Sequence, residues 1–206
     1  MATILESEGR SSQTGNLHAT ISKISIEDRT HQNRHPGCVV WLTGLSASGK
    51  STIAYALERA LFDEGKHAYV LDGDNIRHGL CSDLGFSPEA RKENIRRIGE
   101  VARLFADAGI ICITAFISPY RSDRDLARRI APDGRFLEVY LNSPLEVCEK
   151  RDPKGLYAKA RKGELKDFTG VSAPYEPPLS PEIELPTDTM SVTDCVAAII
   201  ARVRQS

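Results

Sequence analysis

The segment Gly44–Ser51, with the sequence GLSASGKS, constrains the fold of this chain more than any other part of it. It matches the pattern G-x-x-x-x-G-K-[ST] of a phosphate-binding loop. The apolar stretch 38–43 before it is rich in β-branched residues and predicts a buried strand. After it, apolar residues recur at helical spacing from Ile53 to Leu61. A chance glycine-rich turn before a helix is the alternative, but it does not account for a full match in this context.

The chemistry of this loop follows from its backbone. Glycines allow successive N–H groups to turn inward around phosphates, and the start of the following helix adds positive potential. We expect Lys50 to reach the β- and γ-phosphates of a nucleoside triphosphate and the Ser51 hydroxyl to bind Mg²⁺. The predicted nucleotide-binding residues are Gly44, Leu45, Ser46, Ala47, Ser48, Gly49, Lys50, Ser51 and Thr52.

Composition argues against several other classes of protein. The 206 residues carry a formal net charge of −1, without the basic excess typical of a nucleic-acid-binding protein. No apolar run approaches membrane-spanning length, and Met1–Arg10 lacks the apolar core of a signal peptide. The five cysteines are odd in number and widely spaced, which indicates reduced core residues rather than disulfides or a metal cluster. We therefore expect a cytoplasmic protein with no nucleic-acid partner and no membrane partner.

The chain divides by pattern into two parts. Residues 1–36 are polar with weak periodicity, and we interpret them as an N-terminal arm that is flexible or loosely docked. The alternation from Ile21 to Ile26 can add a strand within this arm or form a contact with a partner. Residues 37–206 alternate strands with helices and are predicted to form one domain. Its predicted strands are 38–43, 68–71, 110–116, 136–141 and an edge strand at 183–185.

Helix signals occupy the intervals between these strands. Ser87 and Pro88 predict the N-cap and the first position of a helix that ends near Gly109. Further helices are predicted at 123–130, after a capping-box pattern at 143–146, and from Val192 to Val203. The alternation predicts the α/β fold of a P-loop kinase, a three-layer α/β/α arrangement with a parallel sheet flanked by helices on both faces.

Polar residues follow the second and third predicted strands, and ligands of such sheets lie at the carboxyl ends of the strands. Asp72 and Asp74 can bind Mg²⁺ through water or accept a proton from an attacking hydroxyl, and Arg77 can hold an anion. A solvated Asp-Gly turn is the alternative. The third strand is followed by Ile117 and Ser118 and by no carboxylate, which argues against motor ATPases and GTPases. Ser118 can bind a phosphate or sulfate oxygen, or simply form a Ser-Pro turn.

Two further segments can complete a second pocket. Arg91 and Asn94 share one face of their helix, and together with Phe86 they can hold a base and its phosphates. A solvated charged face is the alternative. The basic segment 151–163 is interpreted as a mobile lid that closes over two anionic substrates and excludes water. An ordinary charged surface helix is the alternative for this segment.

The ordered set of motifs resembles the adenylylsulfate kinases, and bacterial members most of all. The resemblance covers about residues 37–185 and rests on the stretches GLSASGKST, LDGDNIRHGL, DLGFS, RKENIRRIGEVA, FISPYRSDRD, RDPKGLY and FTGVSAPYEPP. It implies transfer of a phosphoryl group from ATP, with Mg²⁺, to the ribose 3′-hydroxyl of adenosine 5′-phosphosulfate (APS). The products are ADP and 3′-phosphoadenosine 5′-phosphosulfate (PAPS). It also implies a homodimer and an association with ATP sulfurylase. At 16–19 the chain lacks the aromatic residue that many members carry there.

The resemblance also implies the roles of individual residues. The implied catalytic residues are Lys50, Asp72, Asp74 and Ser118, and the implied metal-binding residues are Ser51 and Asp72. Phe86 and Phe168 would sandwich the adenine of the acceptor. The implied substrate-binding residues are Asp74, Asn75, Arg77, Phe86, Arg91, Asn94, Ile117, Ser118, Lys154, Phe168 and Thr169. Ser118 occupies the position that the family describes as a phosphoserine intermediate. We predict direct transfer instead, because in-line transfer needs positioning and charge neutralisation rather than a protein nucleophile.

Three other functions are compatible with parts of the pattern. Another small-molecule P-loop kinase would share the nucleotide site, but two aromatic residues around an anionic pocket suit an adenine with a phosphosulfate better than a sugar acid. A GTP-binding switch would use Asp152–Gly155 as its D-x-x-G motif, but this segment does not follow the third strand and no Asn-Lys-x-Asp motif occurs. A regulatory nucleotide binder without turnover is disfavoured by the intact Lys50, Ser51 and aspartate pair.

Overall fold

The computed structural model describes residues 22–205. The segment 16–19, where the chain departs from the family pattern, and Ile21, the first residue of the predicted arm strand, lie outside the described residues. None of the described helices has both the length and the apolar character that crossing a bilayer would require.

A five-stranded parallel sheet forms the centre of the described part, in the order β2-β3-β1-β4-β5. The register pairs Val40 of β1 with Ile113 of β3 on one side and with Leu137 of β4 on the other. All six residues of β1 are buried, as expected for a central strand covered on both faces. The strands are β1 Cys38–Thr43, β2 Ala68–Asp72, β3 Ile111–Ala115, β4 Phe136–Asn142 and β5 Ile183–Pro186.

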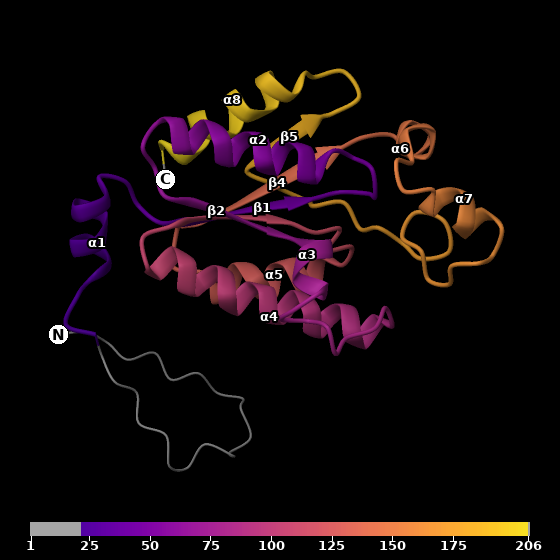
Figure 1. The fold of residues 1–206 in the computed structure, drawn as a ribbon, viewed down its shortest axis with the longest axis horizontal. Coiled ribbons are helices and arrows are strands. Elements are labelled where there is room, and N and C mark those ends of the chain that lie inside the picture. The colour runs from indigo at the N-terminus through magenta and orange to yellow at the C-terminus, as the bar shows by residue number, and fades with distance from the viewer. Residues whose placement is uncertain (1–21, 206) are drawn as a thin grey trace, which may run out of the picture.

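Helices cover both faces of this sheet and give the predicted three layers (Figure 1). The long α2 (Lys50–Asp63) and α8 (Val192–Val203) lie on one face, and α4 (Pro88–Asp107) and α5 (Arg121–Ile130) lie on the other. Each face has its own apolar cluster, and on the α4 and α5 face Trp41 stacks between Phe116 and Phe136. The α/β fold of a P-loop kinase is confirmed.

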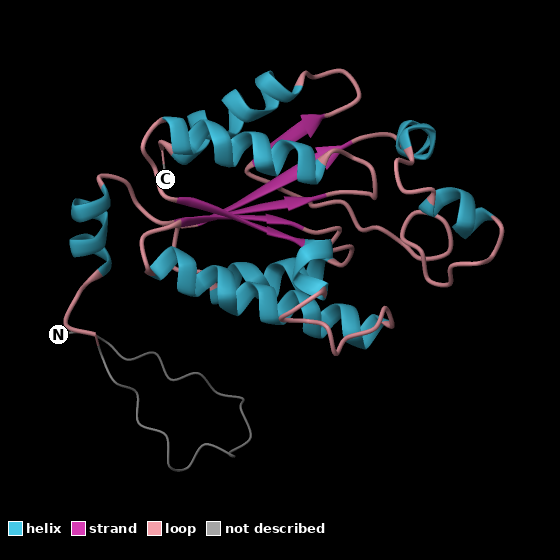
Figure 2. Ribbon diagram, viewed as in Figure 1, coloured by secondary structure: helices cyan, strands magenta, loops and turns pink. Residues whose placement is uncertain are grey.

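Within residues 22–205, four short helices lie outside these layers. They are α1 Ile26–Asn33, α3 Gly73–Arg77, α6 Leu145–Arg151 and α7 Leu156–Arg161. Figure 2 shows α6 and α7 beyond the carboxyl ends of the strands, and α1 near the opposite end of the sheet. The basic lid segment 151–163 therefore lies on the side of the sheet where the ligands of parallel sheets bind.

Helix capping agrees with the sequence prediction at α4 but not at α6. Ser87 caps α4 as predicted, since its hydroxyl accepts a hydrogen bond from Ala90 N at 3.2 Å and Pro88 follows at N1. The capping box predicted at 143–146 is wrong, because the N-cap of α6 is Pro144 and no side chain caps that helix. The chain leaves β4 so that Ser143 is buried and its hydroxyl has no hydrogen-bond partner. Pro144 has an extended ψ of 145° and is itself the N-cap, so the helix begins one residue later than the predicted box requires.

The described part of the arm forms a helix, so the strand predicted at 21–26 is wrong there. Ser25 accepts a hydrogen bond from Asp28 N at 3.0 Å, and the Asp28 carboxylate accepts one from Ser25 N at 2.8 Å. This capping box starts α1, which buries none of its residues. Asn33 donates a hydrogen bond to Gly109 O at 3.0 Å, which ties the end of α1 to the domain. The division of the chain at residues 36 and 37 remains a prediction.

Candidate active site

A cleft of about 670 Å³ lies at the carboxyl ends of the strands. The phosphate loop, the end of β2 with α3, the segment after β3, the lid and the loop around Phe168 all contribute to its walls. Most of the site residues predicted from scattered motifs therefore line one cavity. Three do not line it, namely Gly44, Leu45 and Asn75.

Glycine is required in the phosphate loop for two different reasons. Gly44 has a φ of +149°, and a Cβ there would lie 2.8 Å from Leu141 O and 2.9 Å from Ser48 Oγ. Gly49 has a φ of +100° and is the N-cap of α2, with no side chain bonded to the helix terminus. The first-turn N–H groups of α2 therefore have no side-chain cap and can bind an anion.

Lys50 lies buried within its own loop. Its ammonium donates hydrogen bonds to Gly44 O at 3.0 Å and to Leu45 O at 2.6 Å. Burial lowers the pKa of Lys50 to about 8, because desolvation penalises the charged form. A bound polyphosphate would supply the negative charge that this ammonium lacks among neutral carbonyls.

One carboxylate connects the phosphate loop to β2. Ser51 Oγ donates a hydrogen bond to Asp72 Oδ2 at 2.6 Å, and Asp72 Oδ1 accepts one from Asp74 N at 3.0 Å. Asp72 is thus the N-cap of α3, a short helix that the sequence pattern did not reveal.

The two predicted metal-binding residues, Ser51 and Asp72, therefore lie in contact. Hydroxyl and carboxylate oxygens are the ligand types that Mg²⁺ prefers, and Mg²⁺ usually takes its other ligands from phosphates and water. No group of three or more His, Cys, Asp or Glu residues suited to a metal occurs within residues 22–205. The residues present fit an ion that is shared with a bound nucleotide.

The mouth of the cleft is bridged by an ion pair. Lys154 of the lid donates to the carboxylate of Asp74, and both side chains are more than half exposed. A second lid contact reaches the phosphate loop, where Tyr157 Oη donates to Ser46 O at 3.0 Å. Tyr157 was not predicted as a site residue. The lid therefore contacts both α3, through Asp74, and the phosphate loop.

Two aromatic residues, Phe86 and Phe168, also line the cleft. Phe86 remains exposed, and the Arg77 guanidinium lies 4.3 Å from the centre of its ring. The Arg77 guanidinium also donates to Leu84 O and Gly85 O, which fixes the turn before Phe86. The ring of Phe168 packs edge-on against Tyr157, with ring centres 5.1 Å apart.

Arg91 connects the two segments that carry these rings. It donates to Phe86 O at 2.9 Å, to Asp167 O at 2.6 Å and to the Thr169 hydroxyl at 3.0 Å. Arg91 therefore holds the segment that contains Phe86 at a fixed distance from the segment 167–169. Asn94 lines the same cleft and is 4% exposed, and its Oδ1 has no hydrogen-bond partner. A buried acceptor of this kind is costly unless a ligand pairs with it.

Ser118 lines the cleft but is almost fully buried. Its φ is +40°, its hydroxyl donates to Thr43 Oγ1 at 3.0 Å, and it accepts a hydrogen bond from Trp41 Nε1 at 3.1 Å. Neither partner is a base that could remove the hydroxyl proton. The arrangement therefore favours a structural role for this hydroxyl, with Ile117 and Ser118 forming part of the cleft wall.

The cleft extends beyond the predicted residues into one further region. Asn75, predicted at the substrate, donates instead to Tyr55 Oη at 3.0 Å. The lining of this further region includes Arg151, the first residue of the predicted lid, together with Thr187, Met190, Val192 and Cys195, none of which was predicted as a site residue. We name the segment 187–191, which follows β5, the base loop. The rule that selected the ends of β2 and β3 applies to β5 as well and could have found it.

Hydrogen bonds hold the base loop in place. Thr187 Oγ1 donates to Ser48 O at 2.8 Å, and the Arg151 guanidinium donates to Thr187 O at 2.6 Å. The base loop is thus fastened to the phosphate loop on one side and to the start of the lid on the other.

Comparison with known proteins agrees with this geometry. The family model described as Adenylylsulphate kinase matches residues 36–186. The chain is 62% identical over 180 residues to the probable adenylyl-sulfate kinase of Halalkalibacterium halodurans, covering 87% of this chain and 89% of that protein. It is 59% identical over 189 residues to the adenylyl-sulfate kinase of Staphylococcus haemolyticus, covering 92% of this chain and 95% of that one.

Solved structures show the same relationship. The Mycobacterium tuberculosis APS kinase CysC in complex with AMPPNP and APS has a TM-score of 0.79 and 48% identity, covering 84% of this chain and 99% of that chain. The hexameric APS kinase from Thiobacillus denitrificans has a TM-score of 0.64 and 30% identity, covering 87% of this chain and 31% of that chain. From the motifs, the fold and these comparisons together, the chain belongs to the adenylylsulphate kinase family.

Proposed function

We propose that this protein transfers the γ-phosphoryl group of ATP to the ribose 3′-hydroxyl of APS, giving PAPS and ADP. A bond forms between the 3′-oxygen and the γ-phosphorus, the bond from that phosphorus to the bridging oxygen breaks, and the hydroxyl proton leaves. The observation that carries the proposal is a single cleft that is lined both by the phosphate loop and by Phe86 and Phe168. Such a cleft suits two nucleotides that meet at their reacting groups.

The donor end would hold ATP. Residues 44–52 bind its phosphates, Lys50 lies against the β- and γ-phosphates, and the base loop with Arg151 receives the adenine. Ser51 and Asp72 would hold Mg²⁺, which neutralises charge on the phosphates when bound. Asp72 keeps the Ser51 hydroxyl oriented and also fixes the start of α3.

The acceptor end would hold APS. Phe86 and Phe168 flank its adenine, Asn94 Oδ1 accepts a hydrogen bond from it, and Arg77 and Arg91 face its anionic groups. Asp74 is the carboxylate proposed to take the hydroxyl proton. Both oxygens of Asp72 already accept hydrogen bonds, whereas the contact of Asp74 is with the lid residue Lys154.

Transfer is proposed to be direct, without a covalent intermediate on Ser118. The Ser118 hydroxyl is engaged by Trp41 and Thr43 and is almost fully buried. Incubating the enzyme with γ-labelled ATP alone should leave Ser118 unlabelled. A phosphorylated Ser118 that passes its label to APS at the rate of turnover would overturn this part of the proposal.

The activity itself is tested with an acceptor panel. Purified protein with Mg²⁺ and ATP is given APS, AMP or gluconate, and ADP release is coupled to chromatography of the nucleotide products. We expect rapid ADP release with APS only, together with a product phosphorylated at the 3′ position. ADP release with gluconate and none with APS would instead support the other small-molecule kinase that the sequence allows.

Three wider properties are proposed on the same basis. A cytoplasmic location suits five cysteines that are all buried and unpaired. Self-association as a homodimer is proposed, and light scattering on the purified protein tests it. Association with ATP sulfurylase is proposed because APS must be supplied by an enzyme that adenylates sulfate, and co-purification of the two proteins tests it.

A further inference from the structure

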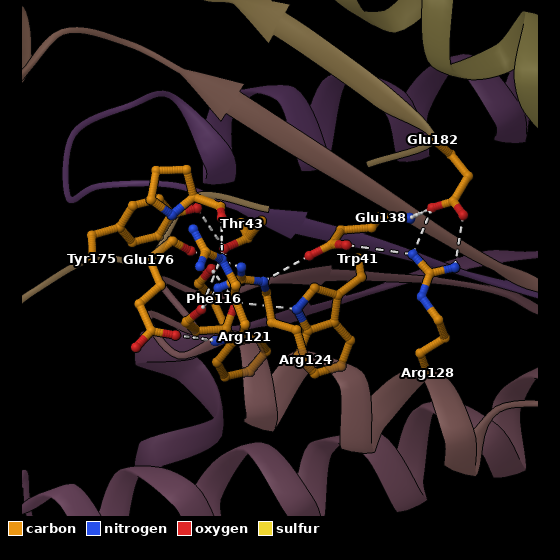
Figure 3. Close-up of polar contacts among 12 residues, drawn as sticks. Trp41, Thr43, Phe116, Arg121, Arg124, Arg128, Glu138, Tyr175, Glu176 and Glu182 are labelled. Carbon is orange, nitrogen blue, oxygen red and sulfur yellow. Dashed lines mark hydrogen bonds and ion pairs between the residues drawn. The ribbon is translucent and has the colours of Figure 1, made fainter. Parts of the chain in front are cut away.

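Arg124 is a buried arginine outside the site residues described above. It lies on α5 with 2% of its side chain exposed. Its three nitrogens donate to three different segments, namely to Glu138 Oε1 at 2.6 Å, Ser118 O at 2.7 Å and Glu176 O at 2.7 Å. Figure 3 shows the guanidinium between β4 and the segment that contains Tyr175 and Glu176.

The charge of Arg124 is balanced inside the protein. Glu138 of β4 is also buried, and its second oxygen pairs with Arg128, which lies one turn further along α5. Arg128 in turn pairs with Glu182, whose carboxylate accepts a hydrogen bond from Glu138 N at 2.7 Å (Figure 3). Burying such charges is costly, and a well-packed apolar residue often gives equal stability. The use of arginine here is better explained by the geometry that its forked donors impose.

One target of Arg124 forms a wall of the acceptor end. Ser118 lines the cleft in a left-handed backbone conformation, with a φ of +40°. Such a conformation is strained for a residue other than glycine and persists only when its surroundings hold it. Arg124 bonds the carbonyl of this residue, while Trp41 and Thr43 hold its hydroxyl.

The other target belongs to a segment that we name the strap, Tyr175–Pro177. Glu176 N donates to Pro119 O at 2.9 Å, and the Glu176 carboxylate accepts from Arg121 N at 2.8 Å. Tyr175 Oη lies 3.0 Å from Thr43 Oγ1. Glu176 therefore joins the strap to the chain after β3 through its backbone N–H and its carboxylate, while its backbone carbonyl accepts the bond from Arg124.

The strap leads back directly to the second aromatic ring of the pocket. Ala173 N donates to Phe168 O at 3.0 Å, and Gly170 N donates to Ala173 O at 2.8 Å, so residues 168–173 form a compact turn. Any shift of the strap is passed through this turn to Phe168 and Thr169, which line the cleft.

We infer that Arg124 is a positioning residue that sets the distance between the Ser118 wall and the Phe168 wall of the acceptor pocket. This inference rests on the proposed function, because it takes that pocket as the APS site. Arg124 does not line the cleft, so its effect on APS is indirect. The donor end is held by other contacts and should not depend on Arg124.

The test compares Arg124→Lys with Arg128→Lys in full steady-state kinetics. Lysine keeps the charge near Glu138 but cannot reach Ser118 O and Glu176 O together. We expect the KM for APS to rise about tenfold or more in Arg124→Lys, since small misplacements of a substrate are costly. The KM for ATP should change less than about twofold at saturating APS, because the donor end is untouched. Arg128→Lys disturbs the same ion-pair network without touching either wall, and it should leave both KM values unchanged.

A second variant guards against misfolding of Arg124→Lys. Glu176→Ala removes the strap's bond to Arg121 N without leaving a buried charge, and it should raise the KM for APS by a smaller factor. If Glu176→Ala or a folded Arg124→Lys raises the two KM values equally or leaves both unchanged, the inference is wrong. If the wild-type protein does not phosphorylate APS, the proposed function fails first, and this outcome is visible before any variant is made.

Discussion

Replacing Thr187 with valine tests the link between the base loop and the phosphate loop. Thr187 Oγ1 donates a hydrogen bond to Ser48 O at 2.8 Å, and both residues are buried. Valine keeps the shape of the side chain but removes the donor. A buried carbonyl that loses its partner costs about 1–3 kcal/mol. For a domain of this size, each kcal/mol lowers the melting temperature by about 2–4 °C.

We therefore expect Thr187→Val to melt about 2–12 °C below the wild type in differential scanning calorimetry. The KM for ATP should rise about three- to tenfold, because ATP must then restore order to a looser donor site. The KM for APS at saturating ATP should stay unchanged.

Thr189→Val is the matched control for this measurement. It lies in the same base loop and donates to Pro186 O at 3.2 Å, but it is exposed, so water can replace its bond. The reasoning fails if Thr187→Val and Thr189→Val melt at the same temperature. It also fails if Thr187→Val raises the KM for APS as much as that for ATP.

Three further predictions concern charged residues of the cleft. Lys50→Ala should lower kcat by about a thousandfold in the coupled ADP assay, because it removes a preorganised charge at the transferring phosphate. Circular dichroism should show that the variant is folded. A kcat close to that of the wild type would show that Lys50 has no catalytic role. Since burial lowers the pKa of Lys50 to about 8, the free enzyme loses the ammonium above that pH. A pH profile of kcat/KM for ATP should therefore be flat below about pH 8 and fall above it, and a profile that is level up to pH 10 would contradict this assignment. Arg77→Ala should raise the KM for APS about tenfold and leave the KM for ATP unchanged, because Arg77 supports Phe86 and faces the acceptor end. Equal changes in the KM for APS and the KM for ATP would refute this role of Arg77.

Most of the sheet could be predicted from the sequence alone. The strand predicted at 38–43 is β1 as observed, and 110–116 exceeds β3, Ile111–Ala115, by one residue at each end. These strands are buried on both faces, so each is a continuous apolar run with clear limits.

Helix starts were harder to predict, and two similar sequence patterns show why. Ser25 and Ser143 each stand three residues before an acidic residue, but only Ser25 forms a capping box. Ser143 follows β4 directly and is buried by the path of that strand. Whether a capping box forms therefore depends on the path of the chain before the serine. The four residues of the capping-box pattern do not reveal that path.

The site was predictable where motifs or strand ends mark it. Ser51 and Asp72 are 21 positions apart and form a hydrogen bond, as expected when the helix that follows β1 and the end of β2 meet at the carboxyl edge of a parallel sheet. Met190 and Val192 were missed because apolar residues that line a cavity look the same in sequence as core residues. Only the packing of the base loop against the phosphate loop distinguishes the two cases.

Besides facing the cleft, the phosphate loop anchors the lid and the base loop through its backbone carbonyls. A loop whose N–H groups face a ligand must direct many of its carbonyls elsewhere. Here Ser46 O accepts a hydrogen bond from Tyr157 of the lid, and Ser48 O accepts one from Thr187 of the base loop. A bound phosphate that shifted the loop would therefore also shift the points where the lid and the base loop are attached. Because both segments are fastened to the loop that binds the phosphates, the donor can prepare the walls of the cleft before transfer occurs.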